Sequence, residues 1–216
     1  MTSMTTIAGI RIPDSALARD ARSLAREHSP AFLLAHVDRT FVFGALATAG
    51  AGLHVDEELG YVAAILHDLG LTEAFGGERR FEIDGAEAAR LWALSQGMSA
   101  DEAQDLWDAI ALHTSAGIAD VRSPLCALVH RGAGLDVLGV GADQLDPALI
   151  DAVHTAFPRD GFSDGLAGVL EAAARRAPAA YAMTWMAPLV NQCCGLELPN
   201  LTSTWPPRDP FAAGAG

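Results

Sequence analysis

The sequence predicts an all-α protein, a compact bundle of many helices that ends in an extended C-terminal tail. Apolar residues recur three and four positions apart through most of the 216-residue chain, whereas the alternating patterns typical of strands are almost absent. Capping residues and glycines divide this pattern into stretches of helical length. Half of the residues are hydrophobic and the mean hydropathy is +0.22, which excludes a disordered chain.

Start and stop signals place the helices in order along the chain. Asp14 is expected to cap the first helix, Pro30 fits the opening turn of the second, and Gly50 ends the second. Ser99 and Glu102 have the spacing of a capping box at the start of the fifth. The expected helices run from about Asp14 to His28, Pro30 to Ala49, Asp56 to Leu69, Asp84 to near Gly97, Ser99 to His113, Pro124 to Ala133 or slightly beyond, Pro147 to Ala156, Ser163 to Arg176 and Trp185 to Cys194.

The domain organisation is simple. No internal repeat or linker interrupts the helical region, so residues 1–198 are expected to form a single domain. Residues 199–216 are rich in proline, glycine and alanine, which is typical of an extended tail. Such a tail is either a poorly ordered terminus or a strap that packs Trp205 and Phe211 onto the body or a neighbouring subunit.

The charge of the chain excludes several classes of partner. There are 27 acidic and 14 basic residues, which gives a formal net charge of −13, and there is no lysine. A nucleic-acid surface needs a clustered basic face, so we expect no nucleic-acid partner, and polyphosphate substrates are disfavoured. No apolar run reaches the ~20 residues that span a bilayer, and no secretory signal is recognised. We therefore expect a cytoplasmic protein with a small-molecule substrate and no membrane partner, and a homo-oligomer as the default assembly.

Two adjacent residues of metal-ligand type end the third predicted helix. His67 and Asp68 directly follow the apolar residues 63–66. A buried His-Asp pair is costly unless other groups compensate it. One alternative needs no metal: Asp68 would cap the following turn while His67 bonds to a backbone carbonyl.

Other predicted helices carry ionisable residues among apolar neighbours in the same way. His36 and Arg39 lie on the second helix, His113 closes the fifth, and Asp136 follows on a helix or turn. Isolated ionisable groups at so many core-facing positions would destabilise the fold, whereas a divalent cation among them would let them compensate one another. Imidazole and carboxylate ligands suit zinc, iron and manganese.

The ordered set of His36, His67-Asp68 and Asp136 resembles the H…HD…D signature of the HD superfamily of metal-dependent hydrolases, over roughly residues 32–139. The resemblance implies that residues 1–198 form an HD-type domain in which His36, His67, Asp68 and Asp136 bind one divalent transition metal. Zinc is the first choice for this metal, with iron or manganese as alternatives. A water molecule on such a cation becomes hydroxide near neutral pH and attacks the substrate.

A further set of residues resembles the cyanamide hydratase branch of that superfamily. The set comprises residues 36–39, 81–86 and 108–113. This resemblance implies the addition of water to a small nitrile-like molecule such as cyanamide, with His113 and Glu82 orienting the substrate and moving a proton. Arg39 is a third candidate catalytic residue, which would hold a substrate anion or, alternatively, form an ion pair with an acidic group behind the site.

Three other functions fit the same residues. A phosphohydrolase acting on a phosphate ester or nucleotide would use the metal and an arginine to stabilise charge on the phosphate oxygens. A dinuclear-iron oxygenase would need additional histidine ligands, for which His113 and His130 are the candidates; otherwise His130 is a structural hydrogen-bond donor. A metal-stabilised binding module without activity is the non-enzymatic alternative.

Aromatic side chains on the predicted helices are candidates for the wall of a substrate pocket, or else for the core. They are Phe41, Phe75, Trp92 and Trp107.

Overall fold

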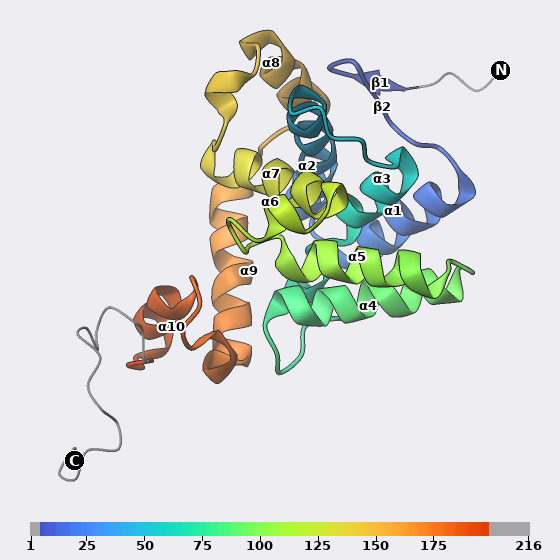
Figure 1. Ribbon diagram of the computed structural model, residues 1–216. Helices are drawn as coiled ribbons and strands as arrows, with labels where there is room; N and C mark the ends of the chain where they lie inside the picture. The colour runs from blue at the N-terminus through green and yellow to red at the C-terminus, as the bar shows by residue number, and fades with distance from the viewer. Residues whose placement is uncertain (1–4, 199–216) are drawn as a thin grey trace.

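The computed structural model describes residues 5–198, and α-helices dominate these residues, as predicted (Figure 1). The helices are α1 Ala16–His28, α2 Ala31–Gly50, α3 Glu57–Leu66, α4 Phe81–Ser95, α5 Ala100–Leu112, α6 Ala119–Arg122, α7 Pro124–Leu138, α8 Pro147–Ala156, α9 Phe162–Arg176 and α10 Ala187–Cys194. The other described elements are the 3-10 helices η1 Leu69–Leu71, η2 Ala142–Gln144 and η3 Pro178–Tyr181 and the antiparallel strands β1 Thr6–Ile7 and β2 Ile10–Arg11. The expected tail, with Trp205 and Phe211, lies outside the described residues.

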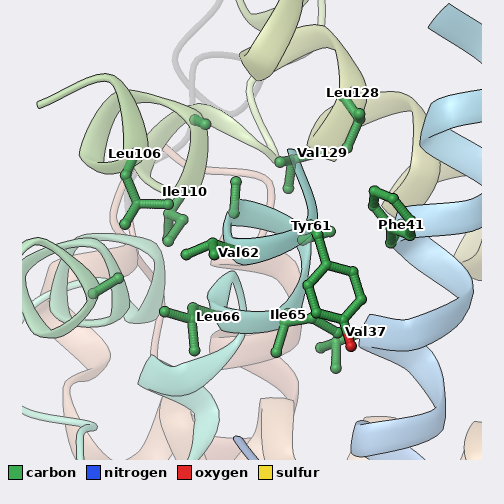
Figure 2. Close-up of a cluster of buried hydrophobic side chains, with 14 of the residues drawn as sticks. Val37, Phe41, Tyr61, Val62, Ile65, Leu66, Leu106, Ile110, Leu128 and Val129 are labelled. Atoms are coloured by element: carbon green, nitrogen blue, oxygen red, sulfur yellow. The ribbon is translucent and has the colours of Figure 1, made fainter. Parts of the chain in front are cut away.

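The core lies between α2, α3, α5 and α7. α2 and α7 pack along each other, α3 packs on both, and α5 joins α3 and α7 to α4. Helix α3 is buried from Gly60 to Leu66, which accounts for its nearly continuous apolar sequence. The side chains that meet in this core are shown in Figure 2: Val37, Phe41, Tyr61, Val62, Ile65, Leu66, Leu106, Ile110, Leu128 and Val129.

Capping side chains set half of the starts of the described α-helices, and two starts differ from the expectation. The capping box of Ser99 and Glu102 is confirmed. At α1 the cap is Ser15 instead of Asp14, because the Ser15 hydroxyl accepts a hydrogen bond from the amide of Ala18. Helix α4 begins at Phe81, three residues before Asp84. The Asp84 carboxylate instead accepts hydrogen bonds from the Gly77 amide and the Arg79 side chain, and so closes the loop that precedes the helix.

In the C-terminal half, α7 extends beyond Ala133, within the predicted range, and one short helix was not predicted. Helix α7 continues to Leu138, where Gly139 ends it in the left-handed conformation with a φ of 71°. The interval between α5 and α7, for which no helix was predicted, contains the short helix α6. The longer α7 is important for the site because it places Asp136 within the helix and keeps it buried.

A second apolar cluster attaches α9 and α10 to the bundle. It joins Leu33, Leu71 and Phe81 to residues of these two helices, including Ala174 and Val190. The hydroxyl of Tyr181 also accepts a hydrogen bond of 3.0 Å from the amide of Phe81. Figure 1 shows α9 (orange) running along one side of the bundle, with α10 against its far end. These contacts hold α9 over the region where α3 and α5 end.

Helix α2 is the one helix of residues 5–198 that is long and apolar enough to cross a membrane. In the most apolar 18-residue stretch of α2, 61% of the residues are buried inside the protein. The buried residues include the ionisable Asp38 and Arg39. This burial identifies α2 as a core helix of the bundle.

Glycines allow the backbones of α2 and α7 to approach each other closely. A Cβ atom at Gly132 would overlap the carbonyl oxygen of Thr40, and a Cβ atom at Gly44 would overlap that of Leu128. Such backbone contacts have no flexible side chain that could move aside. The separation of the two helices therefore depends on glycine at these positions.

The substitution Gly132→Ala is expected to lower the free energy of unfolding by about 1–3 kcal/mol, because an added methyl group would force α2 and α7 apart. Gly134 is a matched control on the same helix, since a Cβ atom there meets no atom within 4 Å. Gly134→Ala should stabilise the helix by about 0.5–1 kcal/mol. Urea unfolding followed by circular dichroism measures both changes, and equal effects of the two substitutions would contradict the close helix contact.

Candidate metal centre

The His-Asp pair lies where α3 ends against the core. His67 keeps right-handed helical dihedral angles after the last residue of α3, and Asp68 leaves the helix at φ −105°, ψ 14°. Both residues are buried, with 0% and 4% of their surfaces exposed. The alternative without a metal is met only in part: His67 Nδ1 does bond to the carbonyl of Ala64, but the Asp68 side chain caps no turn.

Two further histidines converge on Asp68. His36 comes from α2, and His113 follows the last residue of α5. Their Nε2 atoms lie 3.4 Å and 3.7 Å from the Asp68 carboxylate, and the Nε2 atom of His67 lies 3.3 Å from it. The residues that the sequence analysis singled out from three helices are thus brought to one buried point.

Hydrogen bonds on the far side of each ring determine which nitrogen carries the proton. Nδ1 of His67 bonds to the carbonyl of Ala64, and Nδ1 of His113 bonds to the carbonyl of Ile110 at 2.7 Å. A carbonyl oxygen only accepts, so Nδ1 is the donor in both rings. Nδ1 of His36 likewise faces the carboxylate of Asp136 at 2.6 Å. In the neutral rings, all three Nε2 atoms therefore present a lone pair to Asp68.

This arrangement fits a divalent cation. Lone pairs and a carboxylate that face one another without a donor between them are unfavourable in a buried site. The Nε2 atom of His67 is a buried atom without any hydrogen-bond partner in the described structure. One ligand atom each from His36, His67 and Asp68 lie within 4.8 Å of one another. Four ligands about 2.0–2.2 Å from one tetrahedral ion would be roughly 3.3–3.6 Å apart, close to the observed distances.

The pKa values of the three histidines and Asp68 show that these groups do not fully offset the cost of burying one another. Burial and the neighbouring His67 lower the pKa of His113 to about 4, and burial lowers the pKa of His36. The pKa of Asp68 is lowered despite its burial, because three imidazole rings surround it. Only the pKa of His67 is raised, against the effect of burial, because Asp68 lies beside Nε2. The cluster therefore favours positive charge beside Asp68. A proton would supply one positive charge there, whereas a divalent cation would supply two.

Asp136 lies behind His36, at Nδ1, and not beside the Nε2 atoms. Its side chain is fully buried, and both carboxylate oxygens accept hydrogen bonds. Arg39 donates to both of them, at 2.8 and 2.9 Å, and Arg159 bonds to the same carboxylate. The structure therefore does not bring Asp136 into the group of ligand atoms, in contrast to the expected set of four. The Asp136 pKa is lowered despite burial, because His36 and Arg39 donate to the ionised carboxylate.

All three guanidinium nitrogens of Arg39 are bonded to other groups of the protein. Two of them donate to Asp136, and the third bonds to the carbonyl oxygens of Phe157 and Pro158. The guanidinium carbon also lies 4.9 Å from the centre of the Phe162 ring, and the residue is fully buried. Of the two expected roles of Arg39, the structure shows the ion pair with an acidic group behind the site. Arg159, which the sequence analysis did not single out, completes this ion pair from the loop before α9.

Glu82 forms hydrogen bonds to residues around the cluster. Its Oε1 atom accepts hydrogen bonds from Arg80 at 2.7 Å, from Thr114 at 2.6 Å and from Trp185 at 3.3 Å. The pKa of Glu82 is lowered despite burial, because Arg80 and the neighbouring His113 favour the ionised form. This ionised carboxylate links the residue after His113 to the indole of Trp185.

His130 lies against the same region from α7. Its Nδ1 atom donates to the carbonyl of His113 at 2.6 Å, and its Nε2 atom lies 3.6 Å from Asp120. Arg131 donates to the other oxygen of Asp120 at 2.8 Å. His130 is therefore held through the backbone of His113 and does not join the three Nε2 atoms around Asp68.

A large cavity opens directly onto the cluster. Its volume is about 830 Å³, and His36, His67, Asp68 and His113 form part of its wall. The rest is mainly apolar and comes from α2, α7, α9 and the segments around them. The aromatic residues in this wall are Phe81 and Trp185, whereas the expected Phe41, Phe75, Trp92 and Trp107 belong to the main core or pack against it.

Comparison with known protein families agrees with this geometry. A family model described as HD domain matches residues 17–154, which is more than half of the chain and includes the His-His-Asp cluster. No curated protein matches the sequence. The buried cluster of metal-ligand residues and this match together show that the chain belongs to the HD-domain family of divalent-metal-dependent hydrolases.

Proposed function

We propose that the protein adds water to a neutral nitrile-like group, using a divalent metal held by His36, His67 and Asp68. The observation that carries the proposal is the convergence of three Nε2 lone pairs on one buried carboxylate at the wall of a cavity. A divalent cation supplies Lewis acidity there and makes a water molecule acidic near neutral pH, with zinc as our first choice. Asp136 orients the ring of His36 in this proposal, as carboxylates do behind many histidine ligands.

The protein's own residues provide for proton transfer. Addition of water to R–C≡N gives the amide R–CO–NH₂, so one proton must pass from the water to nitrogen before the second follows by tautomerisation. His113 is suited to this transfer because its ring is neutral at Nε2, faces the cavity and is held by the Ile110 carbonyl. Glu82 is ionised and bonded to Thr114 and Trp185, so we propose that it positions these two cavity residues.

The lining of the cavity favours this reaction over phosphate-ester hydrolysis. Phosphoryl transfer depends on cations around the phosphate oxygens. Among the residues that line the cavity, Arg131 is the one arginine, and it is paired with Asp120. The net charge of −13 also opposes the approach of an anionic substrate.

The test is elemental analysis of the purified protein together with assays of urea formation from cyanamide and of amide formation from nitriles. One metal per chain with turnover of such substrates supports the proposal. One metal per chain with turnover only of phosphate esters replaces it by the phosphohydrolase, and two irons per chain would favour an oxygenase. Absence of metal after reconstitution would contradict the site itself.

The substitution His113→Gln should reduce turnover by about 10²–10⁴-fold, because glutamine cannot accept and return a proton. The metal content should stay at one per chain, since His113 Nε2 lies farther from Asp68 than the other two rings do. His54→Gln, at an exposed position outside this cavity, is the control. Parallel loss of metal and turnover in His113→Gln would instead make His113 a ligand.

The substitution Asp136→Asn tests whether Asp136 orients His36 or binds the metal. The asparagine side chain would keep the shape but lose the charge that holds the Nδ1–H of His36, so metal affinity should fall about 10–100-fold. Competition with a chelator of known affinity measures the change. A complete loss of metal binding, equal to that caused by a change at Asp68, would show that Asp136 is the fourth ligand.

A further inference from the structure

The cavity is much larger than a molecule such as cyanamide requires. Its volume of about 830 Å³ lies toward the upper end of the ~300–1,000 Å³ that is usual for sites of drug-sized ligands. A substrate of three heavy atoms would leave most of this space to water. The excess volume therefore calls for a substrate that extends well beyond its reacting group.

Apolar side chains form part of the wall next to the cluster. Leu71 follows the His-Asp turn by three residues, and the ring of Phe81 lies 5.7 Å, edge to face, from that of His113. Both side chains are nearly fully buried, with 4% and 2% of their surfaces exposed. Leu166 and Leu170 of α9 continue this wall away from the cluster. A hydrocarbon group attached to the reacting carbon would meet apolar surface as soon as it leaves the cluster.

Some of the exposed residues of the lining are also apolar. Leu138 and Val140, which line the cavity at and just after the end of α7, have 77% and 65% of their surfaces exposed to solvent. Apolar side chains exposed around a site are typical of surfaces that receive an apolar ligand. The one arginine of the lining is paired with Asp120, so the wall offers a free cation to neither a phosphate nor a carboxylate.

We propose that the cavity selects a neutral substrate with a hydrocarbon substituent several carbon atoms long, placed along Leu71, Phe81 and α9. This inference rests on the proposed function for the identity of the reacting group. The hydrocarbon substituent would supply binding energy by leaving water, and the C≡N group would lie at the His-Asp cluster. Cyanamide itself would be a poor substrate for such a cavity.

The experiment measures how binding depends on chain length. Straight-chain primary amides from acetamide to decanamide, the product class of the proposed reaction, are titrated into the full-length protein in a calorimeter. Affinity should rise about three- to fourfold for each added methylene until the cavity is filled, because each methylene is removed from water. The kcat/KM for the corresponding nitriles should rise in parallel.

Two substitutions make the test specific. Leu170→Asp places a charge in the cavity wall and should remove the dependence of affinity on chain length. Leu91→Asp is the matched control, because Leu91 is 55% exposed on α4 and does not line the cavity. Leu166→Gln is a milder change in the same wall if Leu170→Asp does not fold.

The outcomes separate this inference from the proposed function. Hydration of cyanamide without any effect of chain length would overturn the inference and leave the proposed function standing. Chain-length-dependent binding that Leu170→Asp removes would support the inference, even if no nitrile were hydrated and the proposed reaction failed. The same affinity for all the amides, together with no hydration, would overturn both.

Discussion

The variant Asp68→Asn is expected to fold normally and to hold no divalent metal. Asp68 is the carboxylate that all three Nε2 atoms approach, and an asparagine would keep its size but lose the negative charge that attracts a cation. Metal content should fall from one per chain to less than about a tenth, and turnover should fall at least ~10³-fold, because the acidified water is lost. Elemental analysis and a single-turnover assay measure the two quantities.

Thermal unfolding provides a readout of the same variant that does not depend on activity. A metal at about 1,000 times its dissociation constant stabilises the folded wild-type protein by ~4 kcal/mol, which in a chain of this size raises Tm by roughly 8–16 °C. A chelator should remove this increase in the wild-type protein and have no effect on Asp68→Asn. His54→Ala, at an exposed histidine, should behave like the wild type. A chelator effect that persists in Asp68→Asn would place the metal elsewhere.

The second large effect is expected for Arg39→Met. This change leaves the fully buried carboxylate of Asp136 without the guanidinium that binds both of its oxygens. Breaking a buried pair by removing one partner typically destabilises a protein by about 3–5 kcal/mol. Arg159 remains beside Asp136, but its side chain is 34% exposed and approaches from one side only. Chemical denaturation should therefore show a large decrease in the free energy of unfolding.

Arg11→Met is the matched control for Arg39→Met. Arg11 forms an ion pair with Glu57, but both side chains of this pair are largely exposed to solvent. Exposed pairs of this kind contribute little to stability. A change in Arg11→Met as large as that in Arg39→Met would show that burial does not determine the difference, and would contradict the role assigned to the Arg39–Asp136 pair.

Much of the site could be predicted because local sequence determines it. The capping box at Ser99 fixes the start of α5, and the helix then ends with His113 at the core. The continuous apolar sequence of α3 predicts a fully buried helix, so that His67 and Asp68 at its end had to be buried as well. Local signals thus place His67, Asp68 and His113 at helix ends, whereas their convergence on one point depends on how the helices pack.

The partners of these residues could not be predicted in the same way. The sequence places Asp136 on a helix or turn among apolar residues, but the position of its carboxylate at Nδ1 of His36 depends on how α7 packs against α2. Arg159 comes from a loop whose position depends on how α8 and α9 pack. The cavity wall on α9 likewise depends on long-range packing, so the aromatic residues chosen from helical spacing belong to the main core or pack against it.

The close glycine contact between α2 and α7 has a consequence for the order in which parts of the protein open. Two helices that touch through their backbones exclude solvent from the amides between them, so we expect these amides to exchange their hydrogens last, through global unfolding. His36 and Asp136 lie on these two helices and would then separate only when the whole protein unfolds. Helix α9 carries many exposed residues and should exchange at lower free energy, so that the cavity can admit a ligand while the His-Asp cluster stays assembled.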